Sequence, residues 1–357
     1  MKRDIFVMVT GVGGGGHGEQ IIKALRLAKT RYKIIGSDIS SCSKGLKEVD
    51  YPYIVPKATD PDYLDSIMRI CRKHKVRALF HGSEPELIIM SRYRDLIESE
   101  NIFLPINPQH VIDTCMNKFK TFEFLNAHGF SCPRTHVLSK LNDLSEWTEF
   151  PAIIKPFLGS GGSAHTFIVQ NKWEAQAILK YMSSSRAASQ IIIQAYKGTS
   201  ESEFTVGVLF DMEGKLINSI AVKRNLTSSL SCRIRIPNRT KQRKFGSNLS
   251  VSTGISQGLI GKYPLITRPC ERLAKVLGVK GPLNIQCRLQ DNQVYVFEIN
   301  PRFSGTTSLR AMVGYNEPDI LIRRHVLGEK IKVHFPYKSG TIVRGLCETF
   351  FDKNSFN

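Results

Sequence analysis

Two alternating runs of residues near the C-terminal end, joined by a polar turn, constrain the fold of this 357-residue chain most strongly. The first run places Gln286 among apolar residues, and the second places Glu298 and Asn300 two positions apart. Residues two apart on a β-strand share a face, so Glu298 and Asn300 are predicted to point the same way. The polar turn at 290–293 predicts a hairpin, and pairing about it brings Gln286 beside Glu298.

The predicted polar cluster has the chemistry of a magnesium site. One carboxylate and two amide oxygens suit Mg²⁺, which keeps waters and substrate phosphates as its other ligands. Arg302 follows two residues after Asn300, and its planar fork of five N–H donors suits a phosphoryl group in transfer. The same spacing fits an ordinary amphipathic hairpin whose polar residues face water, so spacing alone leaves both interpretations open.

A second segment upstream has the composition of a phosphate-binding loop. Residues 151–156 form a short apolar strand with Lys155 near its end, followed by a loop that contains Gly159, Gly161 and Gly162. Such a lysine can reach phosphate oxygens, and the backbone N–H groups of a glycine-rich loop can close over them. No Gly-Lys-Ser or Gly-Lys-Thr ends the loop, which excludes a Walker loop. A flexible surface loop after an edge strand is the plainer alternative.

Together these segments resemble the ATP-grasp superfamily, and their sequence motifs are most similar to those of the carbamoyl-phosphate synthase large subunit and its single-module relatives. The resemblance rests on Gln286 with the run 297–305 and on the Ile-Lys-Pro … Gly-Ser-Gly-Gly segment, and it covers roughly residues 4–328. It implies that Arg302 contacts the transferred phosphoryl group. It also implies that magnesium, with manganese as the alternative ion, binds three side chains: Gln286, Glu298 and Asn300.

The resemblance further implies an ATP site. The strand ending at Ala195 is similar to the hinge that holds adenine, and Glu203 fits the acid that takes the ribose hydroxyls, with Glu201 as a close competitor. Two departures are Asn117, where the family has aspartate before Lys118, and Ala195, where it usually has an acid. The second departure leaves the nucleotide preference open. The implied ATP ligands are Lys118, Lys155, Gly159, Gly161, Gly162, Gln194, Tyr196 and Glu203.

The N-terminal third has the pattern of a dinucleotide-binding fold. Residues 5–38 read as a buried strand, a glycine-rich turn, a helix and a second strand that ends in Asp38. A general interpretation would be an NAD site, but a lone glycine-rich turn is weak evidence. ATP-grasp proteins carry such a preceding domain, whose strand ends face the acceptor substrate. His17, Glu84 and Glu86 are therefore candidates for substrate contact, although solvated acids at a helix start explain the two glutamates equally well.

The expected fold class is α/β, with a Rossmann-like pre-ATP-grasp domain followed by an ATP-grasp fold of two α+β subdomains. The chain length suits two or three subdomains with cores of their own. No internal repeat is visible, whereas the carbamoyl-phosphate synthase subunit contains two modules. The expected boundaries are 1–117 for the pre-ATP-grasp domain, 118–194 for the lid, 195–335 for the larger subdomain with the metal site, and 336–357 for a C-terminal strand and tail.

Positive charge is the other strong signal. The formal net charge is +19, and residues 214–270 contain eleven lysines and arginines but no aspartate or glutamate. Such a segment can bind nucleic acid or a membrane surface, or it can draw ATP and an anionic acceptor into a cleft. Few aromatic residues interleave with these cations, which argues against a stacking platform for single strands. By resemblance, the strand with Lys223 and Arg224 faces the active cleft, so one of the two is expected to bind the acceptor carboxylate.

The implied activity is an ATP-dependent ligase that activates a carboxylate as an acylphosphate and joins it to an amine, with release of ADP and phosphate. Its expected catalytic residues are Arg302, Lys223 and Arg224, and its expected partners are small carboxylates and amines. One alternative is a catalytically silent nucleotide- or nucleic-acid-binding protein on the same fold. Another is a bicarbonate-using carboxylase or an enzyme similar to carbamoyl-phosphate synthase.

The composition favours a cytoplasmic protein. No apolar run approaches the roughly 20 residues that span a bilayer, so no membrane partner is expected, and the N-terminus lacks a secretory signal. Eight cysteines are scattered without a Cys-x-x-Cys pair, which favours reduced thiols over disulfides. The oligomeric state stays open, with a homodimer as one candidate.

Overall fold

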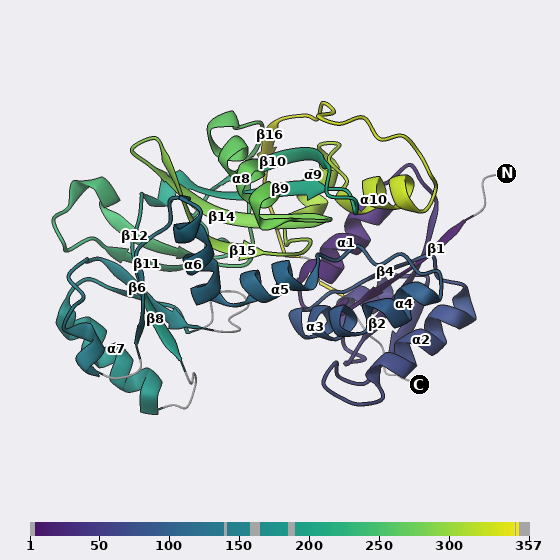
Figure 1. Cartoon of the computed structure of the whole chain (residues 1–357), viewed down its shortest axis with the longest axis horizontal. Coiled ribbons are helices and arrows are strands. Elements are labelled where there is room, and N and C mark those ends of the chain that lie inside the picture. The colour runs from purple at the N-terminus through teal and green to yellow at the C-terminus, as the bar shows by residue number, and fades with distance from the viewer. Residues whose placement is uncertain (1–3, 139–140, 158–164, 185–189, 347, 350–357) are drawn as a thin grey trace.

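The computed structural model describes residues 4–138, 141–157, 165–184, 190–346 and 348–349 (Figure 1). Three residues expected to bind ATP, Gly159, Gly161 and Gly162, lie outside the described residues. No helix in the described ranges has the length and apolar character needed to cross a membrane.

A four-stranded parallel sheet forms the N-terminal part of the molecule, at the right of Figure 1. Its strand order is β3-β2-β1-β4, which confirms the strand–helix alternation that the sequence predicts. The central strand is buried on both faces, because Val7 and Val9 pack into one hydrophobic cluster and Met8 packs into another. The elements are β1 (Ile5–Thr10), α1 (His17–Arg26), β2 (Tyr32–Asp38), β3 (Tyr51–Ile54), α2 (Tyr63–His74), β4 (Ala78–Phe80), α3 (Glu84–Arg92) and α4 (Arg94–Ser99).

A smaller antiparallel sheet, at the left of Figure 1, carries Lys155 and is covered by one helix. Its strand order is β5-β8-β6-β7, and Leu179 and Met182 of the helix pack onto Ile154 and Ile193 in one cluster. Two helices, α5 (Gln109–Met116) and α6 (Lys118–Ala127), connect this sheet to the N-terminal part. Its own elements are β5 (Thr135–Leu138), β6 (Ala152–Pro156), β7 (Phe167–Val169), α7 (Lys172–Ser184) and β8 (Ile191–Ala195).

A six-stranded sheet in the order β15-β14-β9-β10-β13-β16 forms the largest layer. Helix α8 covers one face, where Leu273 packs against Val206 and Ile285, and the N-terminal part covers Ile220 and Val222 on the other. Its elements are β9 (Glu203–Phe210), β10 (Leu216–Arg224), β13 (Gly258–Gly261), α8 (Pro264–Leu277), β14 (Pro282–Gln290), β15 (Gln293–Asn300), α9 (Thr307–Met312), α10 (Glu317–His325) and β16 (Gly340–Ile342). A separate hairpin comprises β11 (Cys232–Pro237) and β12 (Asn248–Ser252).

The hairpin of β14 and β15 forms as the sequence predicts. Its turn residues Asp291 and Asn292 have φ of 51° and 59°, the left-handed values that a two-residue turn of this kind requires. Gln286 pairs directly with Glu298. The next pair joins Cys287 to Val296, so a β-bulge leaves Phe297 without an opposite residue. The parts of the fold thus match the expected class, while the exact domain boundaries stay predictions.

Candidate active site

Two adjoining hollows lie between the six-stranded sheet and the parts that flank it. An inner pocket of about 80 Å³ opens between the lid sheet and the large sheet, and a cleft of about 690 Å³ extends towards the N-terminal part. Lys118, Gln286 and Glu298 line both hollows. The β-bulge contributes here, because it lets the neighbours Phe297 and Glu298 both line the inner pocket.

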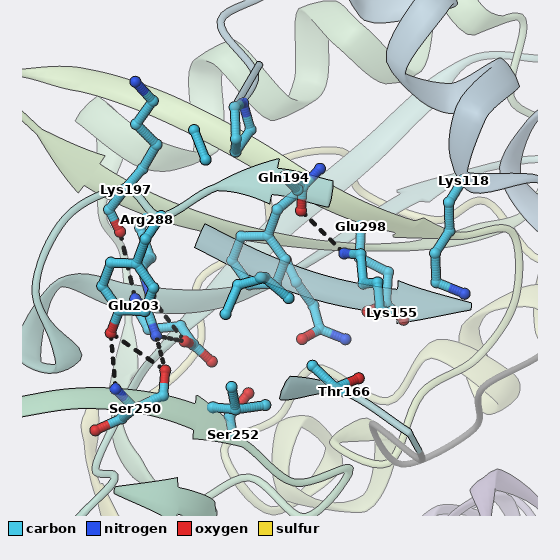
Figure 2. Close-up of a pocket in the computed structure, with 17 residues that line it drawn as sticks. Lys118, Lys155, Thr166, Gln194, Lys197, Glu203, Ser250, Ser252, Arg288 and Glu298 are labelled. Atoms are coloured by element: carbon cyan, nitrogen blue, oxygen red, sulfur yellow. Dashed lines mark hydrogen bonds and ion pairs between the residues drawn. The ribbon is translucent and has the colours of Figure 1, made fainter. Parts of the chain in front are cut away.

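Lys155 lies buried in the wall of the inner pocket (Figure 2). Its Nζ donates to Gln194 Oε1 at 2.9 Å, and Gln194 in turn donates to Thr135 Oγ1 at 2.9 Å, so two strands orient the ammonium group. Burial lowers the pKa of Lys155 to about 8, and the charge of Lys118 acts in the same direction while Glu298 opposes it. A partly desolvated cation held in this way is suited to an anionic ligand.

Lys118 begins helix α6, and Asn117 is the cap of that helix. The Asn117 side chain accepts hydrogen bonds from the backbone N–H groups of Phe119 and Lys120, at 3.0 and 2.9 Å. Asparagine and aspartate cap helices about equally well, which explains why asparagine can stand at this position. The cap sets the helix start so that Lys118 lines both hollows.

Gln286, Glu298 and Asn300 gather on one face of the large sheet, as the sequence predicts. Gln286 lies opposite Glu298, and Asn300 Nδ2 donates to Glu298 Oε1 at 3.1 Å, which leaves the amide oxygen of Asn300 directed away from that carboxylate. In the described ranges, no three His, Cys, Asp or Glu side chains form a metal cluster. The donor set of one carboxylate and two amides nevertheless fits Mg²⁺ that takes its remaining ligands from phosphates and water.

Arg302 lines the cleft beside this face and joins it to the N-terminal part. Its NH2 group donates to Asn300 Oδ1 and to Glu84 Oε1, both at 3.1 Å, and its NH1 group donates to the carbonyl of Phe303. His17 and Glu84 also line the cleft, whereas Glu86 is buried and bonded to Ser83. Burial lowers the pKa of His17 well below its usual value, and Arg302 and His81 act in the same direction.

Glu203 forms a buried ion cluster at the far end of the inner pocket (Figure 2). Arg288 donates to Glu203 Oε2 at 3.0 and 2.8 Å, and Arg224 NH1 lies 3.2 Å from Oε1. Burial alone would raise the pKa of Glu203, but the two arginines outweigh it and hold the pKa below the usual range. Glu201, the competing acid, lies outside the inner pocket in a recess beside Lys223.

Tyr196 packs beneath this cluster in the wall of the inner pocket. Its hydroxyl accepts from the Ser250 backbone N–H at 2.8 Å, and the Arg288 guanidinium lies 4.5 Å from the centre of its ring. Ala195 also lines the pocket. The strand end that the resemblance identifies as the adenine-binding hinge therefore borders the inner pocket with one aromatic and one small apolar side chain.

Lys223 and Arg224 lie on opposite faces of β10, because successive side chains of a strand alternate. Arg224 lines the cleft, and its NH2 group donates to the carbonyls of Thr253 and Ile255 at 2.8 and 3.0 Å. Lys223 lines only the separate recess of about 430 Å³ among the hollows described. Of the two residues expected to face the cleft, the structure brings Arg224 there and leaves Lys223 behind the sheet.

The cations of the acid-free segment are spread over several surroundings. Arg224 is buried, Arg233 lines the cleft, Arg239 pairs with Glu174 on the surface, and Lys262 lies over the ring of Tyr337. This distribution does not make one continuous basic surface of the whole segment.

Some site residues were missed in the sequence. Arg288 and Asn284 flank Gln286 at two-residue intervals on the same strand face, so the period alone could have identified them. The loop Ser304–Thr306, which lines the cleft, has no such pattern.

Asp38, the acid of the alternative NAD interpretation, accepts a hydrogen bond from the backbone N–H of Gly13 at 2.7 Å and so stabilises the glycine-rich turn.

Comparison with known proteins agrees with this arrangement. Residues 9–104 match the family model described as PylC-like, N-terminal domain, and residues 190–348 match the model described as ATP-grasp in the biosynthetic pathway with Ter operon. Residues 190–348 therefore match an ATP-grasp domain. The ATP-grasp model includes the hairpin with Gln286, Glu298 and Asn300, the ion cluster of Glu203, and strand β16.

The chain is similar to the carbamoyl phosphate synthase large chain of Thermoplasma acidophilum, with 22% identity over 303 residues, which cover 82% of this chain and 27% of that protein. It thus spans about a quarter of that relative's length. Its ATP-grasp fold is shared by the L-amino acid ligase from Bacillus licheniformis, with a TM-score of 0.61, 17% identity, and coverage of 91% of this chain and 74% of that one. The N5-carboxyaminoimidazole synthetase from Staphylococcus aureus complexed with ADP has a TM-score of 0.63, 12% identity, and coverage of 96% and 81%.

Proposed function

We propose that this protein is an ATP-dependent ligase that joins a carboxylate to an amine through an acylphosphate. The observation that carries the proposal is the shared wall of the two hollows, where Lys118, Gln286 and Glu298 face both the inner pocket and the cleft. A nucleotide in the inner pocket would place its phosphates at this wall. An acceptor in the cleft would approach the terminal phosphate from the other side.

The inner pocket supplies the groups that a nucleotide needs. Tyr196 and Ala195 offer apolar surface to the base, Glu203 offers a carboxylate to the ribose hydroxyls, and Lys118 and Lys155 offer cations to the phosphates. The lid glycines expected to close over the phosphates lie outside the described residues. A solved structure of the same fold, the N5-carboxyaminoimidazole synthetase, is complexed with ADP, which supports nucleotide binding on this fold.

Gln286, Glu298 and Asn300 would hold the magnesium ion. When bound, the ion would neutralise phosphate charge and polarise the phosphoryl oxygens. The ligand atom of Asn300 would be its Oδ1, which accepts from Arg302 NH2 at 3.1 Å in the structure. Arg302 lines the cleft beside these residues, and its planar fork suits the oxygens of the phosphoryl group.

The proposed reaction has two steps. A carboxylate oxygen attacks the γ-phosphorus, the bond to the β–γ bridging oxygen breaks, and ADP leaves. The amine nitrogen then attacks the acyl carbon, the bond to the phosphate oxygen breaks, and the amine proton passes to the departing phosphate or to water. The protein contributes mainly position and charge, with Arg302 and Arg224 lining the cleft in which both steps take place.

A screen for ADP release tests the proposal. Purified protein with Mg²⁺-ATP is given single amino acids, small carboxylates and bicarbonate, each with and without an amine, and products are identified by mass spectrometry. Hydroxylamine replaces the amine in a parallel set, because it traps an acylphosphate as a hydroxamate. We expect ADP release that depends on the carboxylate, and a hydroxamate from the same acid. Salt-sensitive binding of nucleic acid without any ADP release would instead favour a silent binding protein.

Nucleotide affinity is expected to fall above about pH 8. Burial lowers the pKa of Lys155 to about 8, and bound phosphates would raise it, so binding is strongest when the amine is protonated. The dissociation constant should stay constant between pH 7 and 7.5 and rise above pH 8 by up to about tenfold per pH unit. Calorimetric titration with ADP from pH 7 to 9.5 measures it.

Two variants control the pH experiment. Lys155→Met should bind weakly with a flat profile over this range, because the titrating group is gone. Lys120→Met, which changes an exposed lysine of the same helix start as Lys118, should keep the wild-type profile. If Lys155→Met shows the same pH dependence of the dissociation constant as the wild type, a group other than Lys155 causes that dependence.

A further inference from the structure

Just after β16, Arg344 contacts segments that line the cleft. Arg344 donates from its NH2 group to the carbonyl oxygen of Gly305 and, at 3.0 Å, to Gln20 Oε1. Its backbone N–H donates to Gln257 Oε1 at 3.1 Å. One residue therefore contacts three segments that are far apart in the sequence.

The contacts of Arg344 are partly buried and are linked to further hydrogen bonds. Gln20 is almost fully buried in α1, and its Oε1 also accepts from the Ser308 hydroxyl at the start of α9. Gln257 is buried as well, and its Nε2 donates to Ser228 Oγ at 2.7 Å. Burial lowers the pKa of Arg344, which means that its charge is partly removed from water.

Each of the three segments continues directly into a wall of the cleft. Gly14 to His17 precede Gln20, Thr253 to Ser256 precede Gln257, and Ser304 to Thr306 include Gly305. The last two walls also touch each other, because a Cβ on Gly305 would lie 3.0 Å from the carbonyl oxygen of Gly254. None of these segments carries the residues to which we assign the nucleotide.

We propose that Arg344 is a positioning residue that holds these three walls of the cleft together and thereby sets the affinity for the acceptor. This inference rests on the proposed function for the identity of the cleft as acceptor site. It assigns the C-terminal segment to the active site, although the segment begins on the far edge of the large sheet, next to β13. The Arg344 guanidinium donates to two neutral oxygens, the carbonyl oxygen of Gly305 in the loop and Oε1 of Gln20 in α1, and so connects the loop to the helix. Truncation of Arg344 to alanine leaves both oxygens without this donor.

Steady-state kinetics with Arg344→Ala test the proposal on any acceptor that the ADP-release screen identifies. We expect the KM for the acceptor to rise about tenfold or more, the effect of losing charge-assisted hydrogen bonds, while the KM for ATP changes less than about twofold. Arg344→Lys should recover part of the loss, since an ammonium can reach one of the two oxygens. Val343→Ala, a change at the adjacent and 76% exposed side chain, is the matched control and should leave both constants unchanged.

Hydrogen exchange gives a second readout that needs no turnover. In Arg344→Ala, peptides that contain 303–308 and 14–20 should lose protection, while peptides of the lid strands β6 and β8 should not. Equal acceptor KM and equal exchange in Arg344→Ala and wild type would overturn the inference. A wild-type protein that releases no ADP with any acceptor would instead refute the proposed function, and the exchange result would still decide whether Arg344 holds the walls.

Discussion

Glu298→Gln is expected to lower ATP turnover by more than about 100-fold, because outer-shell changes at metal sites already cost 10- to 100-fold. Glu298 lines both hollows and supplies the only negative charge among the three proposed magnesium ligands. The amide keeps the size and the contact with Asn300 but removes that charge, so the free energy of unfolding should change little. ADP release measured against Mg²⁺ concentration, with denaturant unfolding alongside, checks both parts.

Two further variants calibrate this result. Asn300→Ala removes a neutral ligand and should reduce turnover more mildly than Glu298→Gln. Glu201→Gln changes an exposed glutamate outside the inner pocket and should leave turnover unchanged. If Glu298→Gln turns over ATP at the wild-type rate and with the wild-type magnesium dependence, the assignment of the metal ligands is wrong.

Glu317→Ala is expected to lower the free energy of unfolding by about 3–5 kcal/mol. Glu317 and Arg310 are both fully buried, with 3.0 Å between NH1 and Oε1. Burial raises the pKa of Glu317, and the charge of Arg310 acts against that rise. Without the carboxylate, the guanidinium stays in the core without its opposite charge, which is the costly half of a buried pair.

The pair also supports the active face of the large sheet. Arg310 NH2 donates at 2.7 Å to the side-chain oxygen of Asn284, and Asn284 pairs with Asn300 across the hairpin. The guanidinium lies against Gly207, where a Cβ would overlap it. Loss of Glu317 should therefore disturb the proposed metal-binding strands as well as the stability of the fold.

An exposed pair of the same chemistry is the control. Glu329 forms an ion pair with Arg323 at 2.7 Å, and both side chains are more than a third exposed. Glu329→Ala should change the free energy of unfolding by less than about 1 kcal/mol, because water and salt screen such pairs. Denaturant unfolding of the two variants gives the comparison, and equal losses would contradict the role assigned to burial.

The features that the sequence predicts correctly are those set by local residue patterns. The hairpin of β14 and β15 follows from alternating side chains and from two turn residues that tolerate left-handed backbone angles, so Gln286 and Glu298 meet as predicted. The parallel N-terminal sheet follows from its alternation of strands and helices. The bulge at Phe297 interrupts the alternation of apolar and polar residues along β15. In the sequence it is visible only as a three-residue spacing between the apolar residues Val296 and Ile299.

At two places the sequence pattern reduces the candidates for a site residue to two but does not decide between them. The strand that contains Lys223 and Arg224 was expected to face the cleft, and alternation requires that the two side chains point to opposite faces. Which of them lines the cleft depends on the side of the large sheet that α8 covers. Likewise, Glu201 and Glu203 both fit the spacing of a ribose acid, and only the pairing of β9 with β14 brings Glu203 to the inner pocket.

The parts of this protein that could be predicted from the sequence depend on neighbours along the chain: the hairpin with the proposed metal ligands, the strand with Lys155, and the alternation of strands and helices in the N-terminal sheet. The tertiary structure alone decided which distant residues meet. Arg288 reaches Glu203 because β14 lies beside β9, and Arg344 reaches Gly305 because β16 pairs with β13 at the sheet edge. Such contacts depend on strand order and on the packing of whole layers, which no local period encodes.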